Sequence, residues 1–242
     1  MPVTMFHTLS NVQSGKPVCL QQYIDNQTGA LRVALRSITY TVGWYNLEDG
    51  EYIAWEIEGR SQMHDLDPGL YHFMHIQGIF KGLFRGRDRH PALGITRIDG
   101  MVKLYIPEGW RLLITDGLLK LLGLDDGLGK RWLDPETYTG DRPVDFATVK
   151  TLHIHLNQIS TPQNCCDGAP STLLAVVPVA GSSITRLSHF GDVHHMWFSH
   201  LEFKQLQEGR ISEFEASIRD ENGKILNNHG LPISLTLEIL AI

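Results

Sequence analysis

The chain has 242 residues, of which 42% are hydrophobic and 20% charged, so it is long enough for a full-sized core and too apolar for extended disorder. Its 21 basic and 27 acidic side chains give a net charge of −6, which disfavours nucleic acid or an anionic membrane as the partner of the whole molecule. No apolar run approaches the ~20 residues that cross a bilayer. The three cysteines, Cys19, Cys165 and Cys166, leave one without a disulfide partner. We therefore expect a globular protein of a reducing compartment, without membrane insertion.

The first thirty residues are polar and aperiodic, so the sequence predicts an N-terminal arm over residues 1–30 and a single domain over residues 31–242. From residue 31 onward apolar side chains alternate along a predicted strand, but they change parity midway: first Leu31, Val33 and Leu35, then Ile38, Tyr40 and Val42. A β-bulge or bend near Arg36 and Ser37 would account for this change of face.

Turn signals mark the next strands. Glu48-Asp49-Gly50 precedes an alternating run at residues 51–58, which predicts pairing with the preceding strand. Asp99-Gly100 joins two further runs, residues 95–98 and 101–106. Because this dipeptide tolerates the positive φ angles of a tight turn, these two runs predict a hairpin.

Two segments break the strand pattern and predict helices. Residues 68–84 are apolar at mixed spacing, and residues 115–123 place a leucine-rich run between Thr115 as a cap and Gly123 as a stop. Residues 125–143 are irregular and too long for a simple turn, so we expect a surface excursion at one end of the fold.

The remaining strand candidates are residues 111–114, 149–157, 172–179, 193–203, 211–219 and 233–240. About ten short strands, few helices and no βαβ alternation predict an all-β fold of two packed sheets. The strand pattern alone leaves immunoglobulin-like and jelly-roll connections open.

A histidine pair is the feature most suggestive of chemistry. His153 and His155 are two residues apart on a predicted strand, so both face the same way, as metal ligands would. A metal-binding cupin would add a carboxylate a few residues later, and residues 156–159 contain none. We interpret the pair as the polar face of a strand and predict no metal there.

Three other clusters suggest chemistry less strongly. His200 and Glu202, with the distant His229, match the pattern of an iron oxygenase over three residues, a match that chance supplies. His194 and His195 are adjacent and point to opposite faces, so they and the nearby His189 and His200 are poorly placed to share one zinc ion. Cys165 and Cys166 have no basic neighbour to lower the thiol pKa, which favours an incidental role.

Two groups of larger side chains also have an ordinary interpretation. We expect the tryptophans to fill the core or a subunit interface rather than a sugar site: Trp44, Trp55, Trp110, Trp132 and Trp197. A basic group interleaved with phenylalanines is predicted to be a solvated loop rather than a nucleic-acid site: Lys81, Arg85, Arg87, Arg89 and His90. The common hydrolase and nucleotide motifs are absent, so we predict no enzymatic activity, no catalytic residue and no cofactor.

From about residue 31 to the C-terminus a series of segments carries a resemblance: RSITYTV at 36–42, LDPGLY at 66–71, GMVKLYIP at 100–107, DGLLKLLG at 116–123, LHIHL at 152–156, STLLAVVPV at 171–179 and IRDENGK at 218–224. In this layout the chain resembles the penton-type minor capsid proteins of Polinton (Maverick) elements and adintovirus-like viruses. The resemblance implies a single jelly roll with one or two short inserted helices and no catalytic residue. It also implies homopentamers at the vertices of an icosahedral virion capsid, beside a major capsid protein with a double jelly roll, assembled in the host cytoplasm or nucleus.

Two alternatives remain at this point. One is a jelly-roll binding module that recognises a glycan or a protein through its loops, residues 125–143 included. The other is a metal-dependent, cupin-like enzyme that uses His153 and His155.

Overall fold

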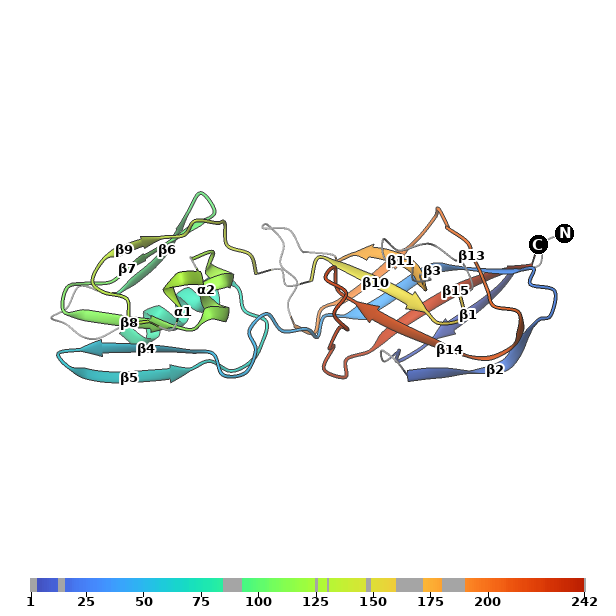
Figure 1. Cartoon of the computed structure of the whole chain (residues 1–242), viewed down its shortest axis with the longest axis horizontal. Coiled ribbons are helices and arrows are strands. Elements are labelled where there is room, and N and C mark those ends of the chain that lie inside the picture. Colours follow the sequence, from blue (N-terminus) through green and yellow to red (C-terminus); the bar gives the residue numbers. More distant parts are fainter. Residues whose placement is uncertain are drawn as a thin grey trace. The chain divides into compact units, whose positions relative to one another are not determined.

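The computed structural model divides the chain into two compact units. The structure describes residues 4–12, 16–84, 93–124, 126–129, 131–146, 149–159, 172–179 and 190–241. One unit, which we call the jelly-roll unit, comprises Met1–Trp44 and Val149–Ile242. The other, Tyr45–Thr148, is inserted into it within a single connection and is called the inserted unit (Figure 1).

The strand order of the jelly-roll unit defines its topology. One sheet has the order β1 (Thr4–Leu9), β15 (Ile233–Ala241), β3 (Leu31–Thr41) and β12 (Val193–Trp197), with β13 (Lys204–Gln205) also paired to β3. The second has the order β11 (Leu173–Pro178), β10 (Thr151–Leu156), β14 (Gly209–Arg219) and β2 (Lys16–Asn26).

All described pairings in this unit are antiparallel. Apart from the two-residue β13, the strands of this unit are, in chain order, β1, β2, β3, β10, β11, β12, β14 and β15. Numbered one to eight in that order, they form one sheet with the order 1-8-3-6 and a second sheet with the order 5-4-7-2. This is the order of an eight-stranded jelly roll, so the all-β, single jelly-roll prediction is confirmed.

Alternation along each strand separates the core from the surface. On β10, Leu152, Ile154 and Leu156 are fully buried, and on β14 the corresponding residues are Phe214, Ala216 and Ile218. The inward positions of β15 carry Ile233, Leu235, Leu237 and Ile239. Each large aliphatic or aromatic side chain buried in this way contributes about 1.5–3 kcal/mol relative to exposure, which makes the interior of the sandwich an apolar core.

The inserted unit has its own sheets and helices. One sheet has the order β5 (Arg60–Asp65), β4 (Tyr52–Ile57) and β8 (Trp110–Ile114); the other has β6 (Gly94–Ile98), β7 (Met101–Tyr105) and β9 (Thr137–Thr139). Two helices, α1 (Phe73–Phe84) and α2 (Asp116–Leu122), and the short η1 (Asp126–Leu128) accompany them. Its buried side chains include Ile53, Phe80, Trp110, Leu112 and Leu118. No helix among the described residues is long and apolar enough to span a membrane.

Several local predictions are confirmed. Asp99 and Gly100 connect β6 to β7 with φ angles of 51° and 84°. Helix α2 ends at Gly123, whose φ is 68°, and a Cβ atom there would lie 2.1 Å from the carbonyl oxygen of Arg142. The predicted bulge is present in β3: Leu35 pairs with Leu237 and Ser37 with Thr236, which leaves Arg36 as the extra residue.

The domain boundaries differ from the prediction. Residues 1–30 are not an arm, because β1 and β2 are the first two strands of the jelly roll and pair with β15 and β14. Nor do residues 31–242 form one domain, because the inserted unit separates β3 from β10. The alternation of apolar residues identifies strands but not their partners, so strands of two units look alike in sequence.

Three smaller expectations also change. The strand after Gly50 pairs with β5 and β8, not with the preceding strand β3. Residues 125–143 belong to the inserted unit, where their described part contains η1 and β9. The strand expected at 193–203 ends at Trp197, and β13 follows as a separate short strand.

Candidate assembly surface

The outward side of the β1-β15-β3-β12 sheet, here called the outer sheet face, carries a mixture of small, polar and aromatic side chains. Registers and burial place on it Thr4, Phe6 and Thr8 of β1, Ser234, Thr236 and Glu238 of β15, Ala34, Arg36, Ser37 and Thr39 of β3, and Val193, His195 and Trp197 of β12. Its central residues Ala34, Ser37 and Glu238 are buried, whereas residues at its two margins are exposed.

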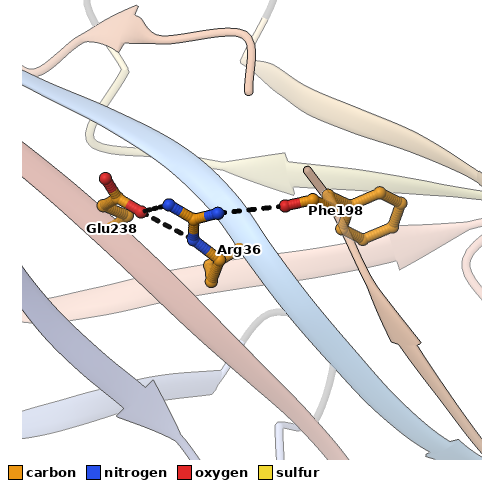
Figure 2. A network of polar contacts seen from close by, with 3 residues as sticks. All are labelled: Arg36, Phe198 and Glu238. Carbon is orange, nitrogen blue, oxygen red and sulfur yellow. Dashed lines mark hydrogen bonds and ion pairs between the residues drawn. The ribbon is translucent and has the colours of Figure 1, made fainter. Parts of the chain in front are cut away.

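An ion pair lies at the middle of this face (Figure 2). Because Arg36 is the bulged residue of β3, its side chain shares the outer face with Ser37 and reaches Glu238 on the neighbouring strand. Its Nε donates to Glu238 Oε2 at 2.6 Å, its Nη2 contacts the same oxygen, and its Nη1 donates to the carbonyl oxygen of Phe198 at 3.1 Å. The pair therefore ties β15 and β3 to the segment that follows β12.

Exposed apolar side chains stand at both edges of the same face. Trp197 is 63% exposed and Val193 65% on β12, and Phe6 is 59% exposed on β1. The Trp197 ring lies 5.4 Å from the Arg36 guanidinium carbon, within the range of a cation–π contact. Large apolar side chains are therefore exposed along both margins of this sheet.

His153 and His155 lie on the same face of β10, as predicted, and this face points away from the sandwich interior. Each alternates with a fully buried Leu or Ile. One ring nitrogen of His153 is 3.1 Å from Thr151 Oγ1, and His155 Nδ1 is 3.2 Å from Thr172 Oγ1. Burial lowers the pKa of His155, and the charges of Arg219 and His153 lower it further. A guanidinium beside the two imidazoles opposes the binding of a cation between them.

Four further histidines of the described part of the chain, His194, His195, His200 and His229, form no common site. His194 and His195 take opposite faces of β12: the His194 ring packs 5.3 Å from Tyr40, and His195 Nδ1 lies 2.8 Å from Thr39 Oγ1. His200 is exposed, Glu202 pairs with Lys204, and His229 occupies a turn with a φ of 46°. Within the described residues no group of three or more His, Cys, Asp or Glu side chains is arranged to hold a metal ion.

The tryptophans divide between core and surface. Trp44, Trp55 and Trp110 are buried, Trp132 is partly exposed beside Arg111, and Trp197 is exposed on the outer sheet face. Cys19 is a free, exposed thiol. Of the remaining residues proposed from sequence, several lie outside the described residues: His189, Cys165, Cys166, Arg85, Arg87, Arg89 and His90.

A pocket of about 380 Å³ lies at one end of the jelly-roll unit, beside the loop that joins β14 to β15. Its described lining is mostly aliphatic, with Lys16, Asn227 and Asn228 as the polar members. Asn228 Nδ2 donates to the carbonyl oxygen of Leu231 at 3.0 Å. No imidazole or carboxylate belongs to this described lining.

Comparison with solved structures places the whole chain beside a viral protein. A crystal structure of the mavirus penton protein superposes over 100% of both chains with a TM-score of 0.50 at 11% sequence identity. This chain shares the fold of the mavirus penton protein. The cryo-EM structure of the Sputnik virophage contains a chain that matches with a TM-score of 0.48 at 9% identity, over 98% of both chains. No family model matches the sequence, and no curated protein matches it.

The agreement with mavirus penton extends over both units. Full coverage of both chains means that the inserted unit, as well as the jelly roll, has a counterpart in that structure. The resemblance inferred from the sequence began at residue 31, whereas the shared fold begins with β1. At 11% identity the likeness concerns the fold.

Proposed function

We propose that this chain is a structural capsid protein, a penton-like minor subunit that forms homopentamers at the vertices of an icosahedral shell. The fold shared with mavirus penton over the whole chain is the observation that carries the proposal. In this proposal the subunit acts in the virion by assembly, beside a major capsid protein with a double jelly roll, and it performs no catalysis.

The arrangement of side chains favours this function over the cupin-like enzyme. A cupin holds its metal inside the barrel, whereas the interior described here is filled by leucine, isoleucine and phenylalanine. The candidate ligands His153 and His155 face outward beside Arg219. The outer sheet face instead carries the exposed Phe6 and Trp197, and aromatic residues are enriched in contacts between proteins.

The experiment is to measure the mass of the purified full-length protein by multi-angle light scattering across a hundredfold concentration range, with negative-stain electron microscopy. We expect a species of five subunits, and closed particles on co-expression with a double-jelly-roll major capsid protein from the same source. A monomer under all of these conditions, with no incorporation into particles, would refute the proposal. Binding of the monomer to a glycan array would then favour the binding-module alternative.

A further inference from the structure

The two edges of the β1-β15-β3-β12 sheet lack the features by which proteins usually protect a strand edge. Exposed edges are normally guarded by charged residues, prolines or bulges, because unpaired backbone groups attract other strands. Neither β1 (TMFHTL) nor β12 (VHHMW) contains Lys, Arg, Asp, Glu or Pro. Their ladders with β15 and β3 are regular over the whole length of both strands.

The second sheet of the same unit provides an internal contrast. Its edge strand β2 contains Lys16, Pro17 and Asp25 and is bulged opposite β14. Its other edge strand β11 ends in Pro178 and is bulged opposite β10. One sheet therefore carries protected edges and the other does not, although both belong to the same sandwich.

Backbone hydrogen bonds show which residues of β12 point to the open edge. Phe198 N–H donates to Arg36 O, and Val42 N–H donates to Asp192 O, each at 2.8–2.9 Å. Since antiparallel pairs alternate, the backbone groups of Val193, His195 and Trp197 are directed away from β3. These are also the residues whose side chains lie on the outer sheet face.

The same reasoning applies to β1. Thr41 N–H donates to Pro232 O, and Val12 N–H donates to Ile233 O, so odd-numbered residues of β15 face β1. Met5, His7 and Leu9 therefore bond to β15, and the backbone groups of Thr4, Phe6 and Thr8 are directed outward. No strand pairs with this side of β1 or β12 among the residues that the structure describes.

We propose that β12 of one copy pairs antiparallel with β1 of a second copy, which extends the sheet from subunit to subunit. The path from β1 to β12 contains four antiparallel strands, so the two edge strands run in opposite directions and fit together head to tail. The strands match in length, at six and five residues. The edge-directed residues of both lie on the outer face, so pairing brings Phe6 next to Val193, His195 or Trp197.

This pairing rests on the proposed self-assembly and identifies the contact that would produce it. A head-to-tail contact uses different surfaces of each copy and closes into a ring when the rotation permits, as a vertex pentamer requires. A seam of five or six residues is the centre of such a contact, because a stable interface buries on the order of 1,200 Å² or more. Trp197, at the end of β12, adds a large aromatic side chain to this contact, and its ring lies 5.4 Å from the Arg36 guanidinium carbon.

Cysteine cross-linking of the full-length chain tests the pairing. In a background of Cys19→Ser, Cys165→Ser and Cys166→Ser, one copy carries Phe6→Cys and a differently tagged copy carries His195→Cys. Opposed residues have Cα atoms about 5.5 Å apart, a separation that a disulfide spans. We expect mild oxidation of the mixture to give the mixed dimer, while either variant alone gives none. Val193→Cys and Trp197→Cys in place of His195→Cys test the registers shifted by two residues.

The control mixture contains Met63→Cys in place of His195→Cys. Met63 is 60% exposed and lies on β5, which belongs to a different sheet. If no register gives more mixed dimer with Phe6→Cys than the Met63→Cys control gives, the pairing is wrong. Cross-linking of one variant with itself would indicate symmetric pairing and would also overturn the proposal. If the protein forms pentamers but no cross-link, the strand pairing is wrong and the proposed capsid function is unaffected. If the protein is a monomer under all conditions, both the strand pairing and the proposed capsid function are wrong.

A charge placed on the edge provides an independent test. His195→Lys in the native-cysteine chain should raise the concentration at which half the protein is assembled by about tenfold or more, because a lysine at a paired edge must lose its hydration. Met63→Lys is the matched control and should leave that concentration unchanged. Equal assembly of both variants, at equal thermal stability, would contradict the pairing.

Discussion

At the scale of single residues, the Arg36–Glu238 ion pair joins β3 to β15 at the middle of the outer sheet face. Glu238 stands on β15 among buried aliphatic residues, and its side chain is 10% exposed. Arg36 is the extra residue of the bulge in β3 and also lies against Trp197. Loss of one partner would leave the other charge nearly buried and poorly solvated.

We predict that Glu238→Ala lowers the free energy of unfolding by about 2–3 kcal/mol, and that adding Arg36→Met restores part of the loss. Chemical denaturation of the single and double variants measures both effects. Asp134→Ala is the control, because the Arg111–Asp134 pair is exposed at both side chains and should contribute less than about 1 kcal/mol. Equal losses at Glu238 and Asp134 would show that burial of the ion pair has no energetic consequence.

The lowered pKa of His155 predicts that stability depends on pH. Its folded-state pKa lies below the ordinary value of 6.5, mainly because of burial and then because of Arg219 and His153. Between these two values the unfolded chain binds more protons than the folded one, so stability falls as the pH drops below about 6.5. We predict that His155→Gln reduces the loss of stability between pH 7.5 and pH 5.5. Because burial also lowers the pKa of His7, part of the dependence should remain. Denaturant titrations at both pH values measure it, and an unchanged pH dependence would contradict the assignment.

At the scale of elements, the bulge in β3 adds one outward-facing residue between two runs whose apolar side chains face the core. Leu35 faces inward, Arg36 and Ser37 both lie on the outer face opposite Thr236, and Ile38 faces inward again. Removal of Ser37 would give an unbroken alternation in which the inward-facing residues keep their partners and Arg36 is retained.

We therefore predict that deletion of Ser37 is tolerated and deletion of Thr39 is not. Without Thr39 the chain beyond Ile38 changes parity, so Tyr40 would move from the core to the surface. Soluble expression and thermal unfolding followed by circular dichroism compare the two variants. A folded Thr39 deletion, or an unfolded Ser37 deletion, would show that the bulge has a different role.

The sequence predicted those elements whose signal is local. The Asp99-Gly100 hairpin, the end of α2 at Gly123 and the parity change at Arg36 each depend on a few neighbouring residues. The first two strands were missed because β1 and β2 lie at sheet edges and carry polar residues that weaken the alternation. The insertion was missed because its strands alternate in the same way as those of the jelly roll.

The candidate surface was only partly predictable from the sequence. The shared orientation of His153 and His155 follows from their spacing, and the structure confirms it. The Arg36–Glu238 contact joins residues 202 positions apart and needs the strand order to be known. A signal was nevertheless present, since Glu238 is a lone carboxylate within the apolar run of β15 and such a charge requires a partner.

At the scale of the whole molecule, the jelly roll is built from two segments that the inserted unit separates. All of its described strand pairings involve residues of those two segments alone. The inserted unit likewise has its own sheets and buried side chains, Trp110 and Leu112 among them. Each unit therefore has the core that independent folding requires.

We predict that replacement of residues 45–148 by a flexible Gly/Ser linker leaves a folded jelly roll. Far-ultraviolet circular dichroism should retain the β spectrum, and thermal unfolding should remain one cooperative transition. The isolated fragment 45–148 should unfold in a transition of its own. Loss of cooperative unfolding in the linker variant would show that the jelly roll requires the inserted unit.

The jelly roll also has a consequence for a chain that has been cut. The segment before the insertion supplies β1, β2 and β3, and the segment after it supplies β10 to β15, so that β15 lies between β1 and β3 while β14 lies beside β2. A protease that cleaves once within residues 45–148 therefore leaves two fragments whose strands interleave in both sheets. Such a nicked protein should elute from a sizing column at the same volume as the uncut protein. In denaturant it should separate into two fragments, and these fragments should reassemble when they are refolded together.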